Sequence, residues 1–197
     1  MKSLFSLKND IAVVTGALGK LGPIWIEALL GAGASVCAID LAGADISDEF
    51  DRLQSHDGEM RLQLIRADVR DRESLEAACE SCLDTFGVPS ILVNNAGIDR
   101  PPANSKQGYR LTEIPLEENR QIFEVNTLGL FQVTQVFGSR MVAAGRGSII
   151  NIGSLYASVS PDDRFYDHIP GDPPFLKPPA YGASKAAVVN LTRYLAT

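Results

Sequence analysis

Residues 11–22 read Ile11-Ala12-Val13-Val14-Thr15-Gly16-Ala17-Leu18-Gly19-Lys20-Leu21-Gly22, an apolar run that passes directly into three spaced glycines. A continuous apolar run is typical of a strand that is buried on both faces, as strands of a parallel sheet are. A helical pattern follows from about residue 20 to residue 32. Strand, glycine turn and helix in this order open a β-α-β unit, so the stretch predicts an α/β fold.

Strand-like and helix-like segments continue to alternate along the rest of the chain. Further strands are expected at 35–39, 62–66, 91–93 and 148–152. Helices are expected at 47–56, at 71–86 with Asp71 as the N-cap, at 117–143, and from about 180 to 197. This alternation predicts a Rossmann-type, doubly wound parallel sheet in a three-layer α/β/α arrangement.

Composition is that of an ordinary globular protein. The chain has 197 residues, of which 45% are hydrophobic and 21% are charged, enough for one well-buried domain. The net charge of −6 argues against a nucleic-acid or anionic-membrane surface. No apolar run approaches the roughly 18 residues of a spanning helix, and residues 1–8 lack the core of a signal peptide. We expect a single domain over residues 1–197, in the cytoplasm, without nucleic-acid or membrane partners.

Cys79 and Cys82 form a Cys-x-x-Cys pair, but they lie inside a segment that reads as mid-helix. A redox pair needs a helix N-terminus, where the dipole lowers the thiol pKa. A zinc site needs more ligands, and the sequence has only two histidines. With an odd total of three cysteines, the sequence predicts half-buried helix cysteines, no disulfide framework and no metal site.

The glycine turn and Asp40 together indicate a dinucleotide site. Glycines after a strand permit a tight turn and let backbone N–H groups approach a pyrophosphate at the start of the next helix. Asp40 closes the second strand, where a carboxylate can accept both ribose hydroxyls of an adenosine, and the uncharged Leu41 follows it. That carboxylate would repel a 2′-phosphate, which favours NAD, although Lys20 keeps NADP open. A structural turn and a capping aspartate are the alternative interpretations.

Tyr181 and Lys185 stand four residues apart in Tyr181-Gly182-Ala183-Ser184-Lys185, within the last expected helix. Residues at this spacing share one helix face. An ammonium beside a phenol favours the phenolate, which makes the phenol an acid/base usable near neutral pH. Because such pairs are also common on helix surfaces, their meaning depends on the other segments.

Six segments in one order resemble the short-chain dehydrogenase/reductase family across nearly the whole chain. They are the glycine turn, Asp68-Val69, Asn94-Asn95-Ala96-Gly97, Asn126, Ser154 and Tyr181-x-x-x-Lys185. The resemblance is to the single-domain type, and it implies an oxidoreductase that interconverts a secondary alcohol and a ketone by hydride transfer with NAD.

The resemblance also implies roles for individual residues. Tyr181 would exchange a proton with the substrate oxygen, and Lys185 would favour the ionised phenol and hold the nicotinamide ribose. Ser154 would hydrogen-bond that substrate oxygen, and Asn126 would bind a water that links Lys185 to solvent. The catalytic set is Ser154, Tyr181, Lys185 and Asn126, and the cofactor-binding set is Gly16, Leu18, Gly19, Leu21, Gly22, Asp40, Leu41, Asp68, Val69, Asn95, Ala96, Gly97, Tyr181 and Lys185. Ser148 is a rival for Ser154, but it precedes its strand and so falls at the wrong end of the sheet.

Three features depart from the family pattern. The glycines follow a Gly-x-x-Gly-x-x-Gly spacing, whereas the family usually places three residues between the first two. Ser154 and Tyr181 are 27 positions apart, about twice the usual gap, and the loop 160–179 between them holds six of the eleven prolines. The chain ends within the Tyr-Lys helix, so the expected sheet lacks the last two family strands. Proline lacks an N–H and fixes φ, so the loop should be neither helix nor central strand.

Two other functions and two further expectations follow. The chain could be a catalytically silent nucleotide-binding or assembly module, or, favoured slightly by the glycine spacing, a sugar-nucleotide epimerase or dehydratase. We expect a homodimer or homotetramer formed through the helix 117–143 and the last helix. Its candidate contacts are Val133, Val136 and Phe137, with burial against the sheet as the alternative. The loop 160–179 should cover the reacting centre with Phe165, Tyr166 and Phe175 and offer polar contacts from Asp162, Asp163, Arg164 and His168.

Overall fold

The structure is a computed structural model that describes residues 5–56, 60–99, 109–175, 177 and 179–197. The chain divides into two compact units. The first comprises Met1–Ala96 and Gly129–Ile152, and the second comprises Gly97–Leu128 and Gly153–Thr197. In the described part of the chain, no helix has both the length and the apolarity needed to cross a membrane.

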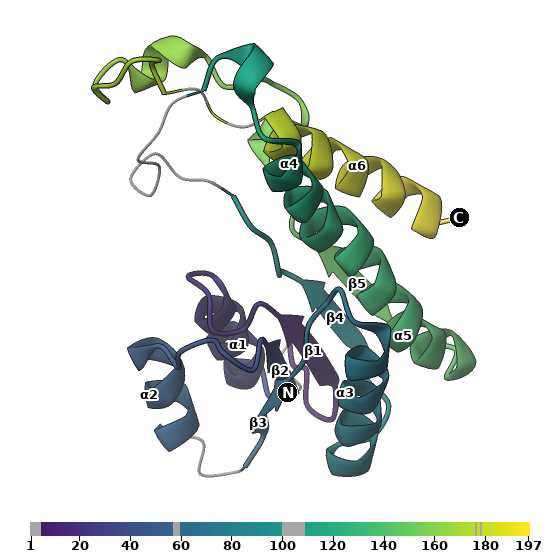
Figure 1. Cartoon of the computed structure of the whole chain (residues 1–197). Coiled ribbons are helices and arrows are strands. Elements are labelled where there is room, and N and C mark those ends of the chain that lie inside the picture. Colours follow the sequence, from purple (N-terminus) through teal and green to yellow (C-terminus); the bar gives the residue numbers. More distant parts are fainter. Residues whose placement is uncertain (1–4, 57–59, 100–108, 176, 178) are drawn as a thin grey trace. The chain divides into compact units, whose positions relative to one another are not determined.

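The first unit is built on a five-stranded sheet in which every pairing is parallel, in the order β3-β2-β1-β4-β5 (Figure 1). The strands are β1 (Ile11–Thr15), β2 (Ser35–Asp40), β3 (Leu62–Arg66), β4 (Ile91–Asn94) and β5 (Ser148–Asn151). The order runs outward from β1 in both directions, which confirms the predicted doubly wound Rossmann sheet. The ends of β1, β2 and β4 therefore meet at one edge, and Thr15, Asp40 and Asn94 lie along it.

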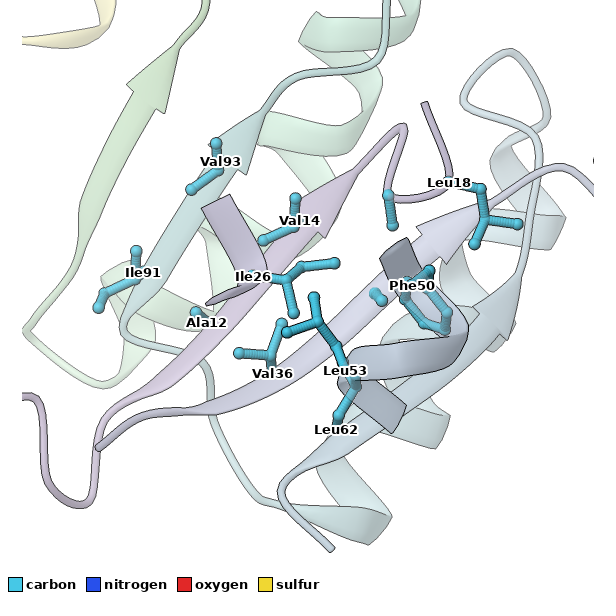
Figure 2. Close-up of a cluster of buried hydrophobic side chains, with 12 residues drawn as sticks. Ala12, Val14, Leu18, Ile26, Val36, Phe50, Leu53, Leu62, Ile91 and Val93 are labelled. Carbon is cyan, nitrogen blue, oxygen red and sulfur yellow. The ribbon is translucent and has the colours of Figure 1, made fainter. Parts of the chain in front are cut away.

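Helices cover both faces of this sheet. They are α1 (Gly22–Gly31), α2 (Asp48–His56), α3 (Arg72–Thr85) and α5 (Leu130–Ala143). Figure 2 shows Ile26 of α1 and Phe50 and Leu53 of α2 packed against alternate strand residues such as Val14 and Val36. Neighbouring strand residues point to the opposite face, where α3 and α5 pack together.

The start of α3 follows the prediction in detail. Asp71 is the N-cap, and its carboxylate accepts hydrogen bonds from the N–H groups of Glu73 and Ser74 at 3.0 and 3.4 Å. These bonds satisfy two of the donors that a helix start leaves open, which explains why α3 begins where it does.

The cysteines of α3 lie mid-helix as predicted, but they are fully rather than half buried. Cys79 is 1% and Cys82 is 0% exposed, and Cys37 of β2 is also buried. Hydrogen bonding with Cys82 and burial raise the pKa of the Cys37 thiol. Burial raises the pKa of Cys79. These are properties of inert core thiols and not of a reactive pair.

The expected long helix 117–143 is interrupted by a π-helical turn. It consists of α4 (Leu116–Phe123), the π turn η3 (Glu124–Gly129) and α5. Apolar periodicity does not distinguish a π turn from an α-helical one, so this turn was not predicted. Such wide turns are frequent at functional sites, and this one holds Asn126.

The apolar side chains proposed as subunit contacts on α5 are buried instead. Val133 and Phe137 are 0% and Val136 is 5% exposed, because this face of α5 packs on the sheet. The alternative expectation, burial against the sheet, is confirmed for all three.

The second unit is helical. It contains α4, the short 3-10 turns η2 (Leu111–Glu113), η4 (Leu155–Ala157) and η5 (Asp163–Tyr166), and α6 (Pro179–Leu195). The last helix packs against α4 and η4. In the Pro-rich loop, the one departure from the expected irregular backbone among residues 160–175 is η5, where Asp162 accepts a hydrogen bond from the Arg164 N–H at 3.0 Å. Leu176 and Pro178 of this loop lie outside the described residues.

Candidate active site

The glycine turn packs so tightly that side chains are excluded at two of its positions. Gly16 has φ +64°, and a Cβ there would lie 2.8 Å from the Cα of Ala96. A Cβ on Gly22 would lie 2.3 Å from the carbonyl oxygen of Ala17. The Gly19 N–H closes the turn by donating to the Gly16 carbonyl at 3.3 Å. The glycines therefore allow the backbone to pack closely where β1 passes into α1.

The start of α1 is open to an anion. Its N-cap, Leu21, makes no side-chain cap, and the first turn holds no acidic residue. The N–H groups of a first turn carry partial positive charge, and no acidic side chain of this turn competes for them. The predicted pyrophosphate contact at Leu18 to Gly22 fits this geometry.

Asp40 is joined to the glycine turn. Its Oδ2 accepts a hydrogen bond from the Leu18 N–H at 2.7 Å, and its Oδ1 accepts one from the Leu41 N–H at 2.8 Å. A carboxylate has about four acceptor positions, so two further donors, such as ribose hydroxyls, can still bind. Asp40 thus fixes the turn and retains the capacity that the sequence prediction requires.

Asn95 holds the turn from its other side. Its Nδ2 donates to the carbonyls of Thr15 and Gly16 at 3.0 and 2.9 Å, and its Oδ1 accepts from the indole N–H of Trp25 at 3.1 Å. The N–H groups of Asn95 and Ala96 donate to Thr15 Oγ1. The structure therefore brings Asn95 and Ala96 against the glycine turn, as predicted for a common cofactor site, and it adds Trp25 as a positioning residue.

Asp68 and Val69 follow β3, where an adenine contact was predicted. The guanidinium of Arg70 binds the Asp68 carboxylate with Nη2–Oδ2 at 2.6 Å, and this hydrogen bond holds the pKa of that carboxyl below its ordinary value. Val69 is 7% exposed. Arg70, only two residues further along, was missed because a surface arginine gives no distinctive sequence signal.

In the second unit, Tyr181 and Lys185 occupy one face of α6. Tyr181 is half-buried, Lys185 is 5% exposed, and Lys185 Nζ lies 5.9 Å from the centre of the Tyr181 ring. Burial lowers the pKa of Lys185, and the negative charge of Asp99 partly opposes this shift. The predicted pair is therefore a partly desolvated contact and not a surface coincidence.

Asn126 connects this helix to the segment that follows β4. Its side chain is fully buried and bonds to both backbone polar groups of Ile98, and its Nδ2 also donates to Ser184 Oγ at 3.1 Å. A Cβ built on Gly97 would lie 3.3 Å from Asn126 Oδ1 and 3.6 Å from Lys185 Nζ. Asn126, Gly97 and Lys185, which are far apart in the sequence, are thus brought together.

Ser154 is linked through Tyr156 to the cluster formed by Tyr181, Lys185 and Asn126. It is the N-cap of η4, and its Oγ accepts a hydrogen bond from the Tyr156 N–H at 3.2 Å. The Tyr156 ring meets the Tyr181 ring edge to face, with centres 6.3 Å apart at 84°. The rival Ser148 is the first residue of β5 and pairs with Ile91, at the end of the strand opposite to Asn151.

A cavity of about 520 Å³ opens beside Tyr181 within the second unit. Its walls include Leu111, Ile114, Tyr156, Ser158, Asp163, Tyr166, Lys177, Tyr181 and the small residues Gly182 and Ala183. The prediction that the Pro-rich loop covers this centre is thus correct for Asp163 and Tyr166. Phe175 is buried behind Tyr166, with ring centres 5.0 Å apart. Phe165, expected as a wall, is 72% exposed and does not line the cavity. His168, Asp162 and Arg164, expected as polar contacts, are also absent from its lining.

Lys177 and Asp99 also belong to this cluster, although the sequence interpretation passed over both. Lys177 Nζ lies 2.6 Å from Asp99 Oδ2 and 5.0 and 5.2 Å from the ring centres of Tyr156 and Tyr181. The sequence did hold a signal for Lys177, because Lys177 precedes Tyr181 by four residues and Lys185 follows Tyr181 by the same number. Asp99 stands two residues after the Asn-Asn-Ala-Gly segment.

Comparison with known proteins gives a consistent result. The family model described as short chain dehydrogenase matches residues 10–165. Fluoren-9-ol dehydrogenase of Terrabacter sp. is 34% identical over 188 residues, which cover 94% of this chain and 51% of that protein. Galactitol 2-dehydrogenase of Rhizobium johnstonii is 32% identical over 193 residues, which cover 98% of this chain and 66% of that protein.

Solved structures match as well. A short chain dehydrogenase/reductase from Burkholderia phymatum, solved in complex with NAD, superposes with a TM-score of 0.78 and 25% identity. The match covers 98% of this chain and 60% of that one. The chain therefore spans between about half and two thirds of the length of these relatives.

Proposed function

The chain belongs to the short-chain dehydrogenase family, and on this basis we propose that it is an NAD-dependent oxidoreductase that interconverts a secondary alcohol and a ketone. The observation that carries the proposal is the contact between Tyr181 and the buried Lys185 at the edge of a cavity of about 520 Å³. An acid/base pair beside a cavity of this size suits a small-molecule substrate.

The first unit fits the cofactor by its turn and by its charge. Gly16 and Gly22 permit the tight turn between β1 and α1, the start of α1 carries no side-chain cap, and Asp40 stands at the end of β2. When bound, NAD supplies the acceptor for the hydride that leaves the carbinol carbon. Because the Asp40 carboxylate would repel a 2′-phosphate, we propose NAD rather than NADP as the cofactor.

The second unit supplies the proton chemistry. In alcohol oxidation, the ionised Tyr181 would take the hydroxyl proton of the substrate, and in ketone reduction the neutral phenol would return it. The Lys185 ammonium lies 5.9 Å from the centre of the Tyr181 ring, so a positive charge stands beside the phenol that would exchange the proton. The Ser154 hydroxyl would donate to the substrate oxygen as negative charge develops there. A water held by Asn126 as a proton path from Lys185 stays a prediction.

The experiment that tests this function separates binding from turnover. NADH fluorescence and absorbance would be measured with polyols, hydroxy acids and cyclic secondary alcohols, using this chain and a form extended at its C-terminus. We expect NADH binding, and NADH formation with at least one class of alcohol. Binding without turnover in both forms would favour the catalytically silent module. Absence of NADH binding would overturn the proposal.

We also propose that the protein forms a homodimer or homotetramer. With Val133, Val136 and Phe137 buried, the support comes from exposed apolar side chains elsewhere on the same helices. Val142 of α5 is 82% exposed, and Tyr194 of α6 is 71% exposed. Light scattering at micromolar concentration would test this, and a monomer would contradict it. Val142→Glu should weaken the association, because it places a charge where an apolar contact is proposed.

A further inference from the structure

Lys177 is a buried cation in the wall of the cavity next to Tyr181. Its side chain is 9% exposed, and Nζ donates to Asp99 Oδ2 at 2.6 Å. An ammonium carries three N–H donors, and Asp99 is the hydrogen-bond acceptor for Nζ among the described residues. The rings of Tyr156 and Tyr181 stabilise the charge through their faces, but they do not satisfy the remaining donors.

The wall around Lys177 is rich in donors. The hydroxyl groups of Tyr156 and Tyr166 lie 3.5 Å apart, and both residues line the cavity. Burial and the hydrogen bond with Tyr156 raise the pKa of Tyr166 to about 12, so Tyr166 keeps its proton at neutral pH. Phenol O–H groups and ammonium N–H groups therefore face the same space, and their natural complement is a group that only accepts hydrogen bonds.

The charged groups near the cavity also favour a ligand that carries negative charge. Lys185 is buried and the side chain of Lys177 is 9% exposed, and among the described residues the carboxylate of Asp99 interacts with both of them. Asp163 also lines the cavity, but it is exposed, and water and salt screen its charge.

The ion pair with Asp99 fixes the position of the Lys177 ammonium. Asp99 directly follows Ile98, whose backbone N–H and C=O are both held by the buried Asn126 side chain. The ion pair thus ties the end of the Pro-rich loop to a rigid anchor. Lys177 therefore stands in the cavity wall as a pre-oriented donor.

We infer that Lys177, assisted by Tyr156 and Tyr166, binds a carboxylate on the substrate, so that the substrate is a hydroxy acid or the corresponding keto acid. This inference rests on the proposed function and specifies its substrate class. The carboxylate would accept hydrogen bonds from the free Lys177 N–H groups and from the tyrosine hydroxyls, and the carbinol carbon would face Tyr181. The unusually long separation of Ser154 and Tyr181 then has a purpose, because the inserted loop carries this cation.

The test compares matched substrates in matched variants. Initial rates would be measured with 3-hydroxybutanoate, its methyl ester, butan-2-ol and a four-carbon polyol. Lys177→Met keeps an unbranched side chain only one atom shorter and removes its charge, and Lys8→Met removes an exposed charge as the control. We expect Lys177→Met to lower kcat/KM for the hydroxy acid about tenfold or more, mainly through KM, and to leave the ester and the plain alcohol within about twofold.

An equal loss of kcat/KM for all substrates would assign Lys177 a structural role and overturn the inference. Unchanged kinetics of Lys177→Met, or a preference of the wild type for the polyol, would also overturn it. Tyr166→Phe, which preserves the packing on Phe175, should give a smaller loss confined to the hydroxy acid, and it replaces Lys177→Met if that variant does not fold.

Calorimetry of acetoacetate binding provides a readout that does not need turnover. Tighter binding to the wild type than to Lys177→Met supports the inference, and equal affinity overturns it. A wild type that binds acetoacetate but oxidises no alcohol would instead contradict the proposed function.

Discussion

The side-chain amide of Asn126 binds both backbone polar groups of Ile98, with Oδ1 accepting from the N–H at 2.8 Å and Nδ2 donating to the C=O at 3.0 Å. The same amide reaches Ser184, the residue next to Lys185, so one buried group organises the surroundings of the proposed acid/base pair.

Replacement of Asn126 by leucine should therefore destabilise the protein. Asn126→Leu has a similar volume but leaves the N–H and C=O of Ile98 without their partner. Buried unsatisfied polar groups cost about 1–3 kcal/mol each, so we expect a loss of about 2–4 kcal/mol in urea unfolding. Asn190→Leu on the exposed face of α6 is the control and should change little. Equal effects of the two substitutions would show that the Ile98 bonds contribute nothing.

Gly22→Ala should impair both folding and NAD binding. The added Cβ would lie 2.3 Å from the Ala17 carbonyl oxygen, which is backbone and cannot rotate away. We expect a cost of about 1–3 kcal/mol or more, with weaker NAD binding because the turn is displaced. Gly31→Ala adds the same methyl group to the same helix, where no atom lies within 4 Å, and should be tolerated. Thermal unfolding and calorimetry measure both effects, and a stable Gly22→Ala variant with normal NAD affinity would refute this explanation of the turn.

Asp40→Asn should narrow the preference for NAD over NADP. The amide still offers an oxygen to the Leu18 N–H, so the turn keeps its anchor while the charge that repels a 2′-phosphate is removed. We expect the ratio of the two dissociation constants to fall about tenfold or more in calorimetric titrations. Asp45→Asn removes an exposed charge nearby in the sequence and should leave the ratio unchanged. Wild-type protein that binds NADP as tightly as NAD would disprove the assignment of Asp40.

Tyr181→Phe should abolish turnover while NADH binding stays intact. The ring and its contact with Tyr156 are retained, and only the proton-transfer group is lost. General acid/base groups contribute about 10²–10⁴ in rate, which sets the expected loss in kcat. Tyr194→Phe, at an exposed position of the same helix, serves as the control. Substantial residual activity would mean that another residue moves the proton.

Lys185→Met should raise stability at neutral pH while it removes activity. Burial lowers the pKa of Lys185, so the folded state disfavours the ammonium relative to the unfolded chain. This penalty is fully present below the lowered pKa of the folded state and disappears as pH rises past the ordinary value of 10.5. The advantage of Lys185→Met in urea unfolding should therefore shrink toward that pH. Lys8→Met is the control, and an advantage that grows with pH would show that the sign is wrong.

The fold could be predicted from the sequence because its signals are local. Five apolar runs gave all five strands to within one residue at each end, and Asp71 marked the start of α3. The π turn could not be predicted, because Glu124–Gly129 has the same apolar spacing as an ordinary helix. The bond between Asn126 in this turn and Ile98, 28 positions away, is likewise absent from any local pattern.

Only some residues of the candidate site could be predicted from the sequence. Motif residues such as Asp40 and Tyr181 stand at fixed offsets from strands and helix turns, and those offsets can be read from the chain. The ion pair of Lys177 with Asp99 joins residues 78 positions apart, and one of them lies in an irregular loop. The spacing of Lys177 from Tyr181 can be read from the sequence, but its pairing with Asp99 cannot, because that pairing depends on how the loop folds back.

The distribution of aromatic and sulfur-containing residues gives each unit its own spectroscopic probe. All three cysteines, which are buried and free, and the single tryptophan, Trp25, belong to the first unit, whereas all five tyrosines belong to the second. A buried thiol reacts with iodoacetamide only after local opening, so the rate of alkylation and the tryptophan emission report on the sheet. Tyrosine absorbance reports on the helices around Tyr181. One unlabelled sample can therefore show whether the two units unfold in a single transition or one after the other.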